Sequence, residues 1–597
     1  MKTAMLKSLN FSRFQFTGIV CTILGFLIVF QVIRIQTSAT HQKISQWAGE
    51  TFGYETETLT PERGNIYDRN GNLLAGNMIV YEIGVDLQSV ANPHTIAEVL
   101  SPLISKDFND ILAASSIKYD PKTAIYAVLK DNIHSDVINK IKTLSAQLDK
   151  SNPGGANSSQ PSLRGLVFTP YLVRSYPEYS LASNILGFFS FQEQQNARGY
   201  YGIEGRYDQI LAGTPTQVTV PLDPYLISDI PSVEPGASLV LTINRDIQGM
   251  VEQVLNKSVD KYGAASGTII VLNPKTGEIL AIASTPQMNL NEYWNSTELY
   301  PQGYMFDRAI GATYEPGSVF KVLTMAAALD AGAVTPTTPF LDTGYIEVGG
   351  VGIYNWDRSA WGPQDMTGCM QNSLNVCLAW VATQLGNEKF YQYMQAFGIG
   401  RPTNIDLSGE QYWPLSVPGD PQWYPVNLGT NAFGQGVAVT PIQMATAISA
   451  VANGGRMMAP HVVAAIIQNG QQYNISPQVI ASPISEKTAK DLTEMLSNSL
   501  EGESSAALVE GYRIAGKTGT AEIPINGHYT MDVTNTSFAG WGPSDDPQFL
   551  IYVWLEKPSS SIWATETASP TFHDVAEQLV VLMGIPPDSI RHELQGK

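Results

Sequence analysis

The sequence predicts an α+β fold in which an antiparallel sheet carries helices on both sides. An elongated domain of mixed strands and helices and one transmembrane helix are expected before it. Strand-like segments at residues 239–243 and 549–555 enclose a stretch that reads mainly as helix, and an uncharged apolar run occupies residues 16–33. The 597 residues, 44% hydrophobic and 15% charged, suit about two to four domains with packed cores.

The first element is the apolar run at residues 16–33. Its 18 uncharged residues are just long enough to cross the hydrocarbon core of a bilayer as a helix. Lysine and arginine precede the run, and such a flank keeps the N-terminus in the cytoplasm. We therefore expect a cytoplasmic tail over residues 1–14, a transmembrane anchor over 15–35 and a bacterial extracytoplasmic location for the rest. A cleaved signal peptide is the alternative, but no clear small-x-small cleavage site follows.

The next domain is expected over residues 36–235, where short strands and turns alternate. Residues 61–75 place apolar residues around an Asn-Gly pair, which indicates a hairpin. Short helices between residues 94 and 149 predict an inserted subdomain over about 85–165. Five charged residues could form a site, but their scatter among turn residues favours buried ion pairs that join segments: Arg63, Asp68, Arg69, Arg174 and Glu204.

The last domain is expected over residues 236–597. It should contain a strand at 239–243, a helix at 246–261, a hairpin at 267–283, helices at 321–331, 372–384, 388–397 and 441–453, a strand at 549–555 and a last helix at 572–583. Because its strands lie near both ends and its helices lie between them, one antiparallel sheet with helices packed on it is the simplest arrangement.

Charge and cysteine content exclude several classes of function. The net charge of −19 argues against nucleic acid as a partner, because binding to phosphates needs basic patches. The three cysteines, Cys21, Cys369 and Cys377, have no metal-ligand spacing, and we expect neither a metal nor a cofactor. A disulfide between Cys369 and Cys377 is one interpretation for an exported chain, but two small buried thiols are favoured.

The chemistry is predicted to centre on Ser318 and Lys321 in the stretch Tyr-Glu-Pro-Gly-Ser-Val-Phe-Lys. A Pro-Gly turn precedes them and an Ala-, Leu- and Met-rich run follows, so both side chains should share one face of a helix's first turn. Burial and the positive end of the helix dipole should lower the pKa of the lysine. A neutral lysine beside a serine hydroxyl is a base beside a nucleophile.

The serine-lysine spacing alone is not specific. Ser115 and Ser258 are also followed by a lysine three residues later. Only Ser318 is followed by an Ala-rich helix that should bury its lysine.

Ser373 and Asn375 form a second motif, Ser-Leu-Asn. Two residues apart, they face the same space only if the backbone is extended or in a loop, where they present a hydroxyl and an amide together. The same spacing at Ser8 and Asn10 is expected on the cytoplasmic side and cannot take part.

A third motif comprises Lys517, Thr518, Gly519 and Thr520. Small residues flank it, and a strand of small residues lets another backbone or an extended ligand approach closely. The Lys-Thr-Gly at Lys275, by contrast, lies between a proline and a glutamate in a predicted hairpin turn, where its lysine should be exposed.

Ser-x-x-Lys, Ser-x-Asn and Lys-Thr-Gly, in this order within one domain, form a known catalytic signature. On these motifs the chain resembles the class B penicillin-binding proteins, membrane-anchored peptidoglycan D,D-transpeptidases. Segments at 63–71, 174–177 and 202–204 resemble motifs of the family's pedestal, or dimerisation-type, domain, and Phe-Gly-Gln-Gly at 433–436 is typical of its transpeptidase domain. The Glu-Asp-x-x-Phe motif of the class A glycosyltransferase domain is not found.

The resemblance implies a serine acyl-enzyme mechanism. Lys321 would take the proton of Ser318, which attacks the carbonyl between two D-Ala residues of a peptidoglycan stem. Ser373 would relay a proton to the leaving amine, and Asn375 would orient Lys321 and the substrate amide. An amine of a neighbouring stem would then resolve the acyl-enzyme and form a crosslink.

The resemblance also implies how substrates and inhibitors bind. Lys517 would attract the terminal carboxylate, and Thr518 and Thr520 would donate hydrogen bonds to it. The backbone N–H groups of Ser318 and Thr520 would form the oxyanion hole. β-Lactams mimic D-Ala-D-Ala and should acylate Ser318.

Partners and cellular role are also implied by the resemblance. Members of the family work with membrane glycosyltransferases and other cell-wall or divisome membrane proteins. Asn375 in place of aspartate and Thr518 in place of serine resemble division-type members more than elongation-type ones. The site of action, the third residue of the stem, the acceptor amine and the oligomeric state stay open.

Other functions fit the sequence less well. Neither Gly-x-Ser-x-Gly of the serine hydrolases nor His-Glu-x-x-His of the metalloproteases occurs. A soluble β-lactamase or carboxypeptidase would not need a pedestal, and a β-lactam sensor would need a larger cytoplasmic module than residues 1–14. A scaffold with a dead active site is a further alternative, against which the three intact motifs argue.

Overall fold

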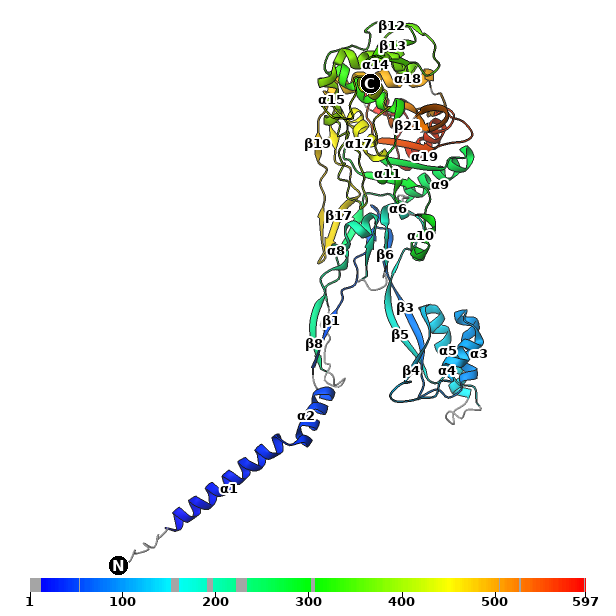
Figure 1. Ribbon diagram of the computed structural model, residues 1–597. Helices are drawn as coiled ribbons and strands as arrows, with labels where there is room; N and C mark the ends of the chain where they lie inside the picture. The colour runs from blue at the N-terminus through cyan, green and yellow to red at the C-terminus, as the bar shows by residue number, and fades with distance from the viewer. Residues whose placement is uncertain are drawn as a thin grey trace, which may run out of the picture. The chain divides into compact units, whose positions relative to one another are not determined.

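This computed structural model describes residues 12–594 and 596, except 53, 152–159, 191–196, 222–232, 302–305, 504 and 526–527. The chain divides into two compact units, one of Met1–Pro61 with Gly213–Pro235 and one of Glu62–Ala212 with Gly236–Lys597 (Figure 1). Each unit is described by itself below.

The first unit contains two helices and a two-stranded sheet. Helix α1 (Arg13–Gln36) includes the predicted transmembrane run, and its side chains are exposed. Among the described residues it is the one helix long and apolar enough to cross a membrane. Helix α2 (Ala39–Phe52) follows, and strand β1 (Tyr54–Leu59) pairs antiparallel with β8 (Thr216–Pro221).

A seven-stranded sheet runs through the second unit in the order β18-β17-β9-β2-β3-β4, with β5 paired to β3. Its strands are β2 (Ile66–Tyr67), β3 (Leu73–Asp86), β4 (Tyr126–His134), β5 (Leu166–Ser175), β9 (Ser238–Leu241), β17 (Val463–Gln468) and β18 (Gln471–Asn474). The predicted hairpin around the Asn-Gly pair is confirmed, because β2 and β3 pair antiparallel across it. Strand β9, expected beside the C-terminal strands, instead pairs with β2 and β17, since its short apolar pattern does not specify partners.

Helices α3 (Pro93–Ile104), α4 (Phe108–Ser115) and α5 (Ser135–Ser151) form the expected inserted helices. They pack with β3 and β4 around a separate core that includes Ile83 and Leu129. Strand β4 was not expected between them, because most of its side chains are exposed and its apolar alternation is weak.

Of the five charged residues expected in buried ion pairs, Arg63, Arg174 and Glu204 form such a network, whereas Arg69 is 38% exposed and lies 3.8 Å from Glu278. Arg63 and Arg174 both donate to Glu204, at 2.8 and 2.7 Å, and Arg63 also donates to Asp208 at 2.8 Å. Burial alone would raise the pKa of Glu204, but the two guanidinium groups outweigh it and hold that pKa below its ordinary value. Asp68 instead accepts backbone N–H groups of its own turn, so it is a turn residue.

Short elements follow this network along the chain. They are α6 (Ser183–Leu186), β6 (Phe188–Ser190), β7 (Arg198–Tyr200), α7 (Gly202–Arg206), α8 (Asp208–Ala212), the 3-10 helix η2 (Leu290–Asn295) and α10 (Ser296–Leu299).

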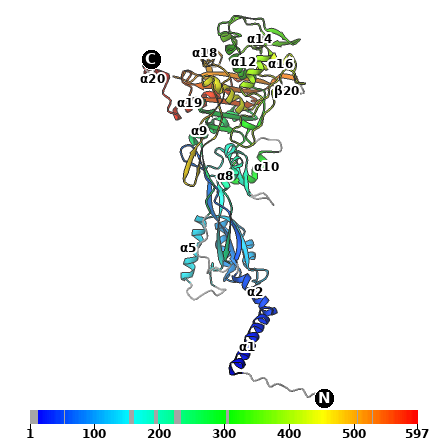
Figure 2. The same cartoon turned by 90° about the vertical axis from the view of Figure 1, so that its left-hand side faces the viewer.

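A five-stranded antiparallel sheet in the order β11-β10-β22-β21-β20 carries the rest of the unit. Its strands are β10 (Ser266–Leu272), β11 (Ile279–Ser284), β20 (Ala515–Ile525), β21 (His528–Gly542) and β22 (Phe549–Glu556). Helices α9 (Arg245–Tyr262) and α19 (Ala568–Leu582) pack on one face with a core of their own (Figure 2). The predicted antiparallel sheet with helices on both sides is confirmed.

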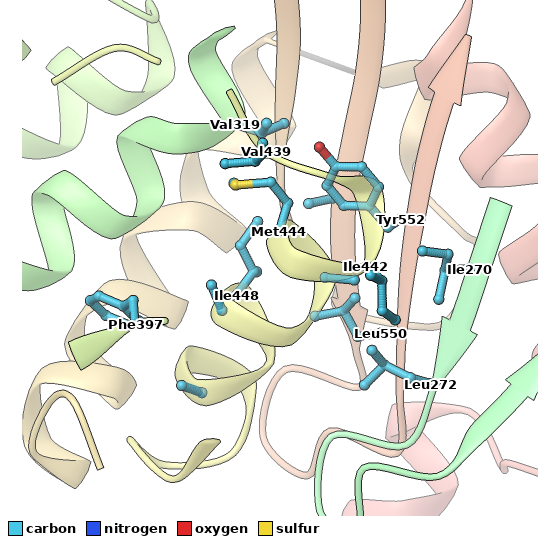
Figure 3. Packing of buried hydrophobic residues seen from close by; sticks show 14 of the residues in the cluster. Ile270, Leu272, Val319, Phe397, Val439, Ile442, Met444, Ile448, Leu550 and Tyr552 are labelled. Atoms are coloured by element: carbon cyan, nitrogen blue, oxygen red, sulfur yellow. The ribbon is translucent and has the colours of Figure 1, made fainter. Parts of the chain in front are cut away.

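On the other face, helix α17 (Pro441–Ala452) lies against the sheet, and each of its residues is buried. Figure 3 shows Ile442 on the side that faces Ile270 and Leu550 of the sheet, whereas Met444 points toward Val319 and Val439 and Ile448 lies on the side of Phe397. A helix that is apolar all round in this way belongs in a core.

The second unit also contains the following elements. They are α11 (Arg308–Gly311), η3 (Gly317–Phe320), α12 (Lys321–Asp330), β12 (Phe340–Asp342), β13 (Tyr345–Val348), β14 (Val351–Tyr354), β15 (Gly362–Gln364), α13 (Met366–Gln371), α14 (Asn375–Leu385), α15 (Asn387–Ala396), α16 (Asn427–Asn431), β16 (Met457–Met458), β19 (Val479–Ala481), α18 (Glu486–Glu503), η4 (Ser505–Ala507) and α20 (Asp588–Leu594).

Candidate active site

Ser318 lies in the 3-10 turn η3, which runs directly into helix α12 at Lys321. Gly317 begins this turn with a φ of +59°, a conformation that favours glycine. The side chain of Lys321 has no exposed surface, whereas the lysines of the other two matches, Lys118 and Lys261, are exposed. Burial of the lysine therefore distinguishes Ser318 from Ser115 and Ser258, as predicted.

The Nζ of Lys321 donates hydrogen bonds to the second motif. It lies 2.6 Å from the backbone oxygen of Ser373, 3.2 Å from the Ser373 hydroxyl and 2.8 Å from Oδ1 of Asn375. The structure thus brings Lys321, Ser373 and Asn375 together from two helices that are separate in sequence.

Ser373 interrupts the helix that the sequence predicted over residues 372–384. Its φ is +54°, so α13 ends before it and α14 begins only at Asn375. The prediction of a continuous helix start was wrong because a left-handed serine is not visible in the apolar pattern. The predicted loop that lets Ser373 and Asn375 face one space is present.

Cys369 and Cys377 form a disulfide, with their Cα atoms 6.1 Å apart. The favoured expectation of two buried thiols was wrong. The break at Ser373 turns α13 back toward α14, and this turn brings two fully buried cysteines on neighbouring helices within bonding distance.

The third motif lies on β20 beside the nucleophile. Lys517 is 1% exposed and its Nζ donates to the Thr518 hydroxyl at 3.0 Å. A Cβ on Gly519 would come 3.0 Å from the Pro316 carbonyl oxygen, so the turn before Ser318 lies directly against this strand. The close approach predicted for these small residues is made by the chain's own backbone. The side chain of Lys275, in the other Lys-Thr-Gly of the chain, is 44% exposed.

Three residues that the sequence did not single out hold the Ser373 segment. The Asn355 side chain accepts the Val376 N–H at 3.1 Å, Trp356 Nε1 donates to the Asn372 oxygen at 3.3 Å, and the Tyr354 oxygen accepts from Asn375 at 3.3 Å. Their signal in the sequence is weak, since they lie between short strands without a periodic pattern.

Glu315 is a further residue to which the sequence assigned no role. One of its oxygens accepts the Gly436 N–H at 3.0 Å and the Tyr529 hydroxyl at 2.9 Å, and burial raises the pKa of this carboxyl. A Cβ on Gly434 would come 2.3 Å from the Gly317 oxygen, so the Phe-Gly-Gln-Gly segment packs on the nucleophile turn. Glu315 therefore ties that segment and β21 to the turn that carries Ser318.

The arrangement supports nucleophilic chemistry. A half-buried serine lies one turn before a buried lysine, with amide and hydroxyl groups on one side and a second buried lysine on the adjacent strand. Among the residues that the structure describes, no group of three or more histidine, cysteine or acidic side chains could hold a metal ion.

Two family profiles match the sequence. "Penicillin binding protein transpeptidase domain" matches residues 267–577, and "Penicillin-binding Protein dimerisation domain" matches residues 58–225.

Individual proteins match over nearly the whole length. Stage V sporulation protein D of Bacillus subtilis is 32% identical over 588 residues, covering 95% of this chain and 85% of that protein. The penicillin-binding protein PbpB of Mycobacterium tuberculosis is 27% identical over 603 residues, covering 95% and 84%. Penicillin Binding Protein 2X of Streptococcus thermophilus, 22% identical with a TM-score of 0.74 over 89% of this chain and 81% of its own, has the same fold.

Proposed function

This chain belongs to the class B penicillin-binding proteins, and on that premise we propose that Ser318 is its nucleophile and Lys321 the base. The protein is a serine-type peptidoglycan D,D-transpeptidase that crosslinks stem peptides and is acylated by β-lactams. The observation that carries the assignment is the buried Lys321, one turn after Ser318, whose Nζ donates to Ser373 and Asn375.

The hydrogen bonds of Lys321 support its role as a base. A neutral amine has two N–H donors and one lone pair. The carbonyl oxygens of Ser373 and of the Asn375 side chain, at 2.6 and 2.8 Å from Nζ, can only accept, so they take both donors. In this state the lone pair can accept a proton from a hydroxyl, which in the proposed reaction is that of Ser318.

In the proposed reaction Ser318 is first acylated by one stem peptide and then released by the amine of another. The Ser318 oxygen bonds to the carbonyl carbon between the two D-Ala residues, and its proton passes to Nζ of Lys321. The bond from that carbon to the terminal D-Ala nitrogen breaks, and the leaving amine receives a proton through Ser373, whose hydroxyl lies 3.2 Å from Nζ. In the second step an amine of a neighbouring stem attacks the ester and releases Ser318.

Strand β20 supports substrate binding. It is the last strand in the order of its sheet, where an extended peptide can lie alongside, and its Lys517 is buried next to Thr518. Lys517, Thr518 and Thr520 would hold the terminal carboxylate, with Gly519 leaving room for the nucleophile turn. The N–H groups of Ser318 and Thr520 would stabilise the oxyanion.

Helix α1 anchors the protein in a membrane, and we place its N-terminus on the cytoplasmic side, with a single pass and the catalytic domain outside. We place the dimerisation-type domain at residues 36–235 and the transpeptidase domain at 236–597; the family matches at 58–225 and 267–577 lie within these ranges. Asn375 and Thr518 favour a role at the division septum, with a membrane glycosyltransferase and divisome proteins as partners.

The test is labelling of the full-length protein with a fluorescent penicillin, followed by peptide mass mapping. We expect one adduct on the peptide that contains Ser318, lost in Ser318→Ala. Ser115→Ala and Ser258→Ala are matched controls, because both serines have the same spacing to a lysine, and both should label normally. Failure of the folded protein to label would refute the acyl-transfer mechanism, and an adduct at Ser115 or Ser258 would refute the choice of nucleophile.

A further inference from the structure

The segment between Cys369 and Cys377 supplies groups that hold the base. Within it, the Ser373 carbonyl oxygen and the Asn375 side-chain oxygen accept from Nζ of Lys321, and the Ser373 hydroxyl lies 3.2 Å from that nitrogen. Acyl transfer depends on the placement of these groups, because a displacement of about 1 Å can slow an enzyme by roughly 100-fold.

This segment is not part of a sheet or a continuous helix. Ser373 adopts a left-handed conformation, at φ +54°, which is unfavourable for a residue other than glycine. Such a conformation persists only where its surroundings determine it. The hydrogen bonds from Leu374 N to the Cys369 oxygen, at 3.0 Å, and from Ser373 N to the Met370 oxygen, at 3.3 Å, close the loop on one side.

The disulfide closes the loop on the other side. Cys369 lies on α13 and Cys377 on the first turn of α14, four residues before and after Ser373. Both cysteines are fully buried, so the bond joins two packed helices and not a surface loop. It therefore sets the separation of the helix ends between which Ser373 and Asn375 lie.

We propose that the Cys369–Cys377 disulfide is a positioning element for acyl transfer, which holds Ser373 and Asn375 against Nζ of Lys321. This inference rests on the proposed function of Ser318 and Lys321. Its effect is expected on the acylation step and not on binding of the substrate carboxylate, because the groups assigned to that carboxylate lie on β20, in a different part of the fold.

The cysteine content makes the test specific. Cys21 is the third and last cysteine and lies in helix α1, so reduction of the protein breaks only the Cys369–Cys377 bond. The experiment compares full-length Cys21→Ser protein in detergent in its oxidised, reduced and reoxidised forms, with free thiols counted by mass spectrometry. Because the disulfide is buried, the Cys369→Ala/Cys377→Ala variant is also measured. This variant lacks the bond without treatment with a reductant.

Acylation by a fluorescent penicillin is separated into its non-covalent dissociation constant and its acylation rate constant. We expect the reduced form and the double variant to acylate about tenfold more slowly, with the dissociation constant unchanged, and reoxidation to restore the rate. If the bond merely stabilised the fold, its loss would lower the melting temperature and leave the acylation rate constant of the folded protein unchanged.

Three results decide the matter. Equal acylation rate constants with and without the bond would overturn the inference, and so would a loss confined to the dissociation constant. If no form is acylated at all, the proposed function fails instead, so the two failures are distinguishable.

Discussion

The Asn375→Ala variant tests whether the acceptors around Lys321 matter for the reaction. The substitution removes Oδ1, which lies 2.8 Å from Nζ of Lys321. When Lys321 takes the proton of Ser318 it becomes an ammonium, so this hydrogen bond is strongest in the transition state and its loss should slow acylation more than binding. Hydrogen bonds to charged groups contribute about 1.5–3 kcal/mol, which corresponds to a rate loss of roughly 10- to 150-fold.

The assay is the rate of acylation by a fluorescent penicillin, with the dissociation constant measured separately. Asn372→Ala is the matched control, because Asn372 is the same residue type three positions earlier and its amide donates to Gln364. We expect the control to stay within about threefold of the parent protein, as for an uncharged side-chain contact at the edge of the segment. If Asn375→Ala also stays within about threefold while the protein remains folded, the transition-state role of Asn375 is refuted.

Two further predictions concern a lysine on β20 and a buried carboxyl. Lys517→Met should weaken the non-covalent binding of a β-lactam carboxylate by roughly 10- to 100-fold. Lys275→Met, at the exposed lysine of the other Lys-Thr-Gly, should leave this binding unchanged, and equal effects of the two substitutions would contradict the role of Lys517. Burial raises the pKa of Asp307 to about 7. Between about pH 4 and pH 7 the folded protein therefore retains a proton that the unfolded chain has released, and the stability of the folded protein falls as pH rises through that window. Asp307→Asn keeps the acceptor for Ser284 and Ala309 without the charge, so its gain in melting temperature over the parent should grow from pH 5 to pH 8; a constant difference would contradict this.

The sequence predicted the local surroundings of Ser318, Lys321 and Lys517 better than it predicted which strands pair. Ser318, Lys321 and the Lys517 strand follow from local composition, because a Pro-Gly turn, an Ala-rich helix and a run of small residues each impose a conformation on their own neighbourhood. The partners of β9 depend on pairings between residues far apart in sequence, which a short apolar strand does not specify.

The segment around Ser373 was predicted least well, and the reason is physical. A left-handed serine has no compositional signature, so the helix was expected to begin at residue 372, whereas α14 begins at Asn375 and a separate helix, α13, ends at Gln371. The disulfide depends on that break, since on one continuous helix two cysteines eight residues apart would lie about 12 Å apart along the axis and could not bond.

Burial of the lysine distinguishes Lys321 and Lys517 from the lysines of the other sequence matches. Lys321 and Lys517 are at most 1% exposed, whereas Lys118, Lys261 and Lys275 are exposed. A buried lysine is costly unless its nitrogen is hydrogen-bonded or neutral, so a fold that buries one must supply oxygen acceptors close by. For Lys321 those acceptors are Ser373 and Asn375, and a segment able to present two of them from a strained turn needs fixed ends. In the proposed mechanism the acceptors that make burial of Lys321 tolerable are also the groups that orient it as a base, so burial of this lysine and its chemistry depend on the same segment.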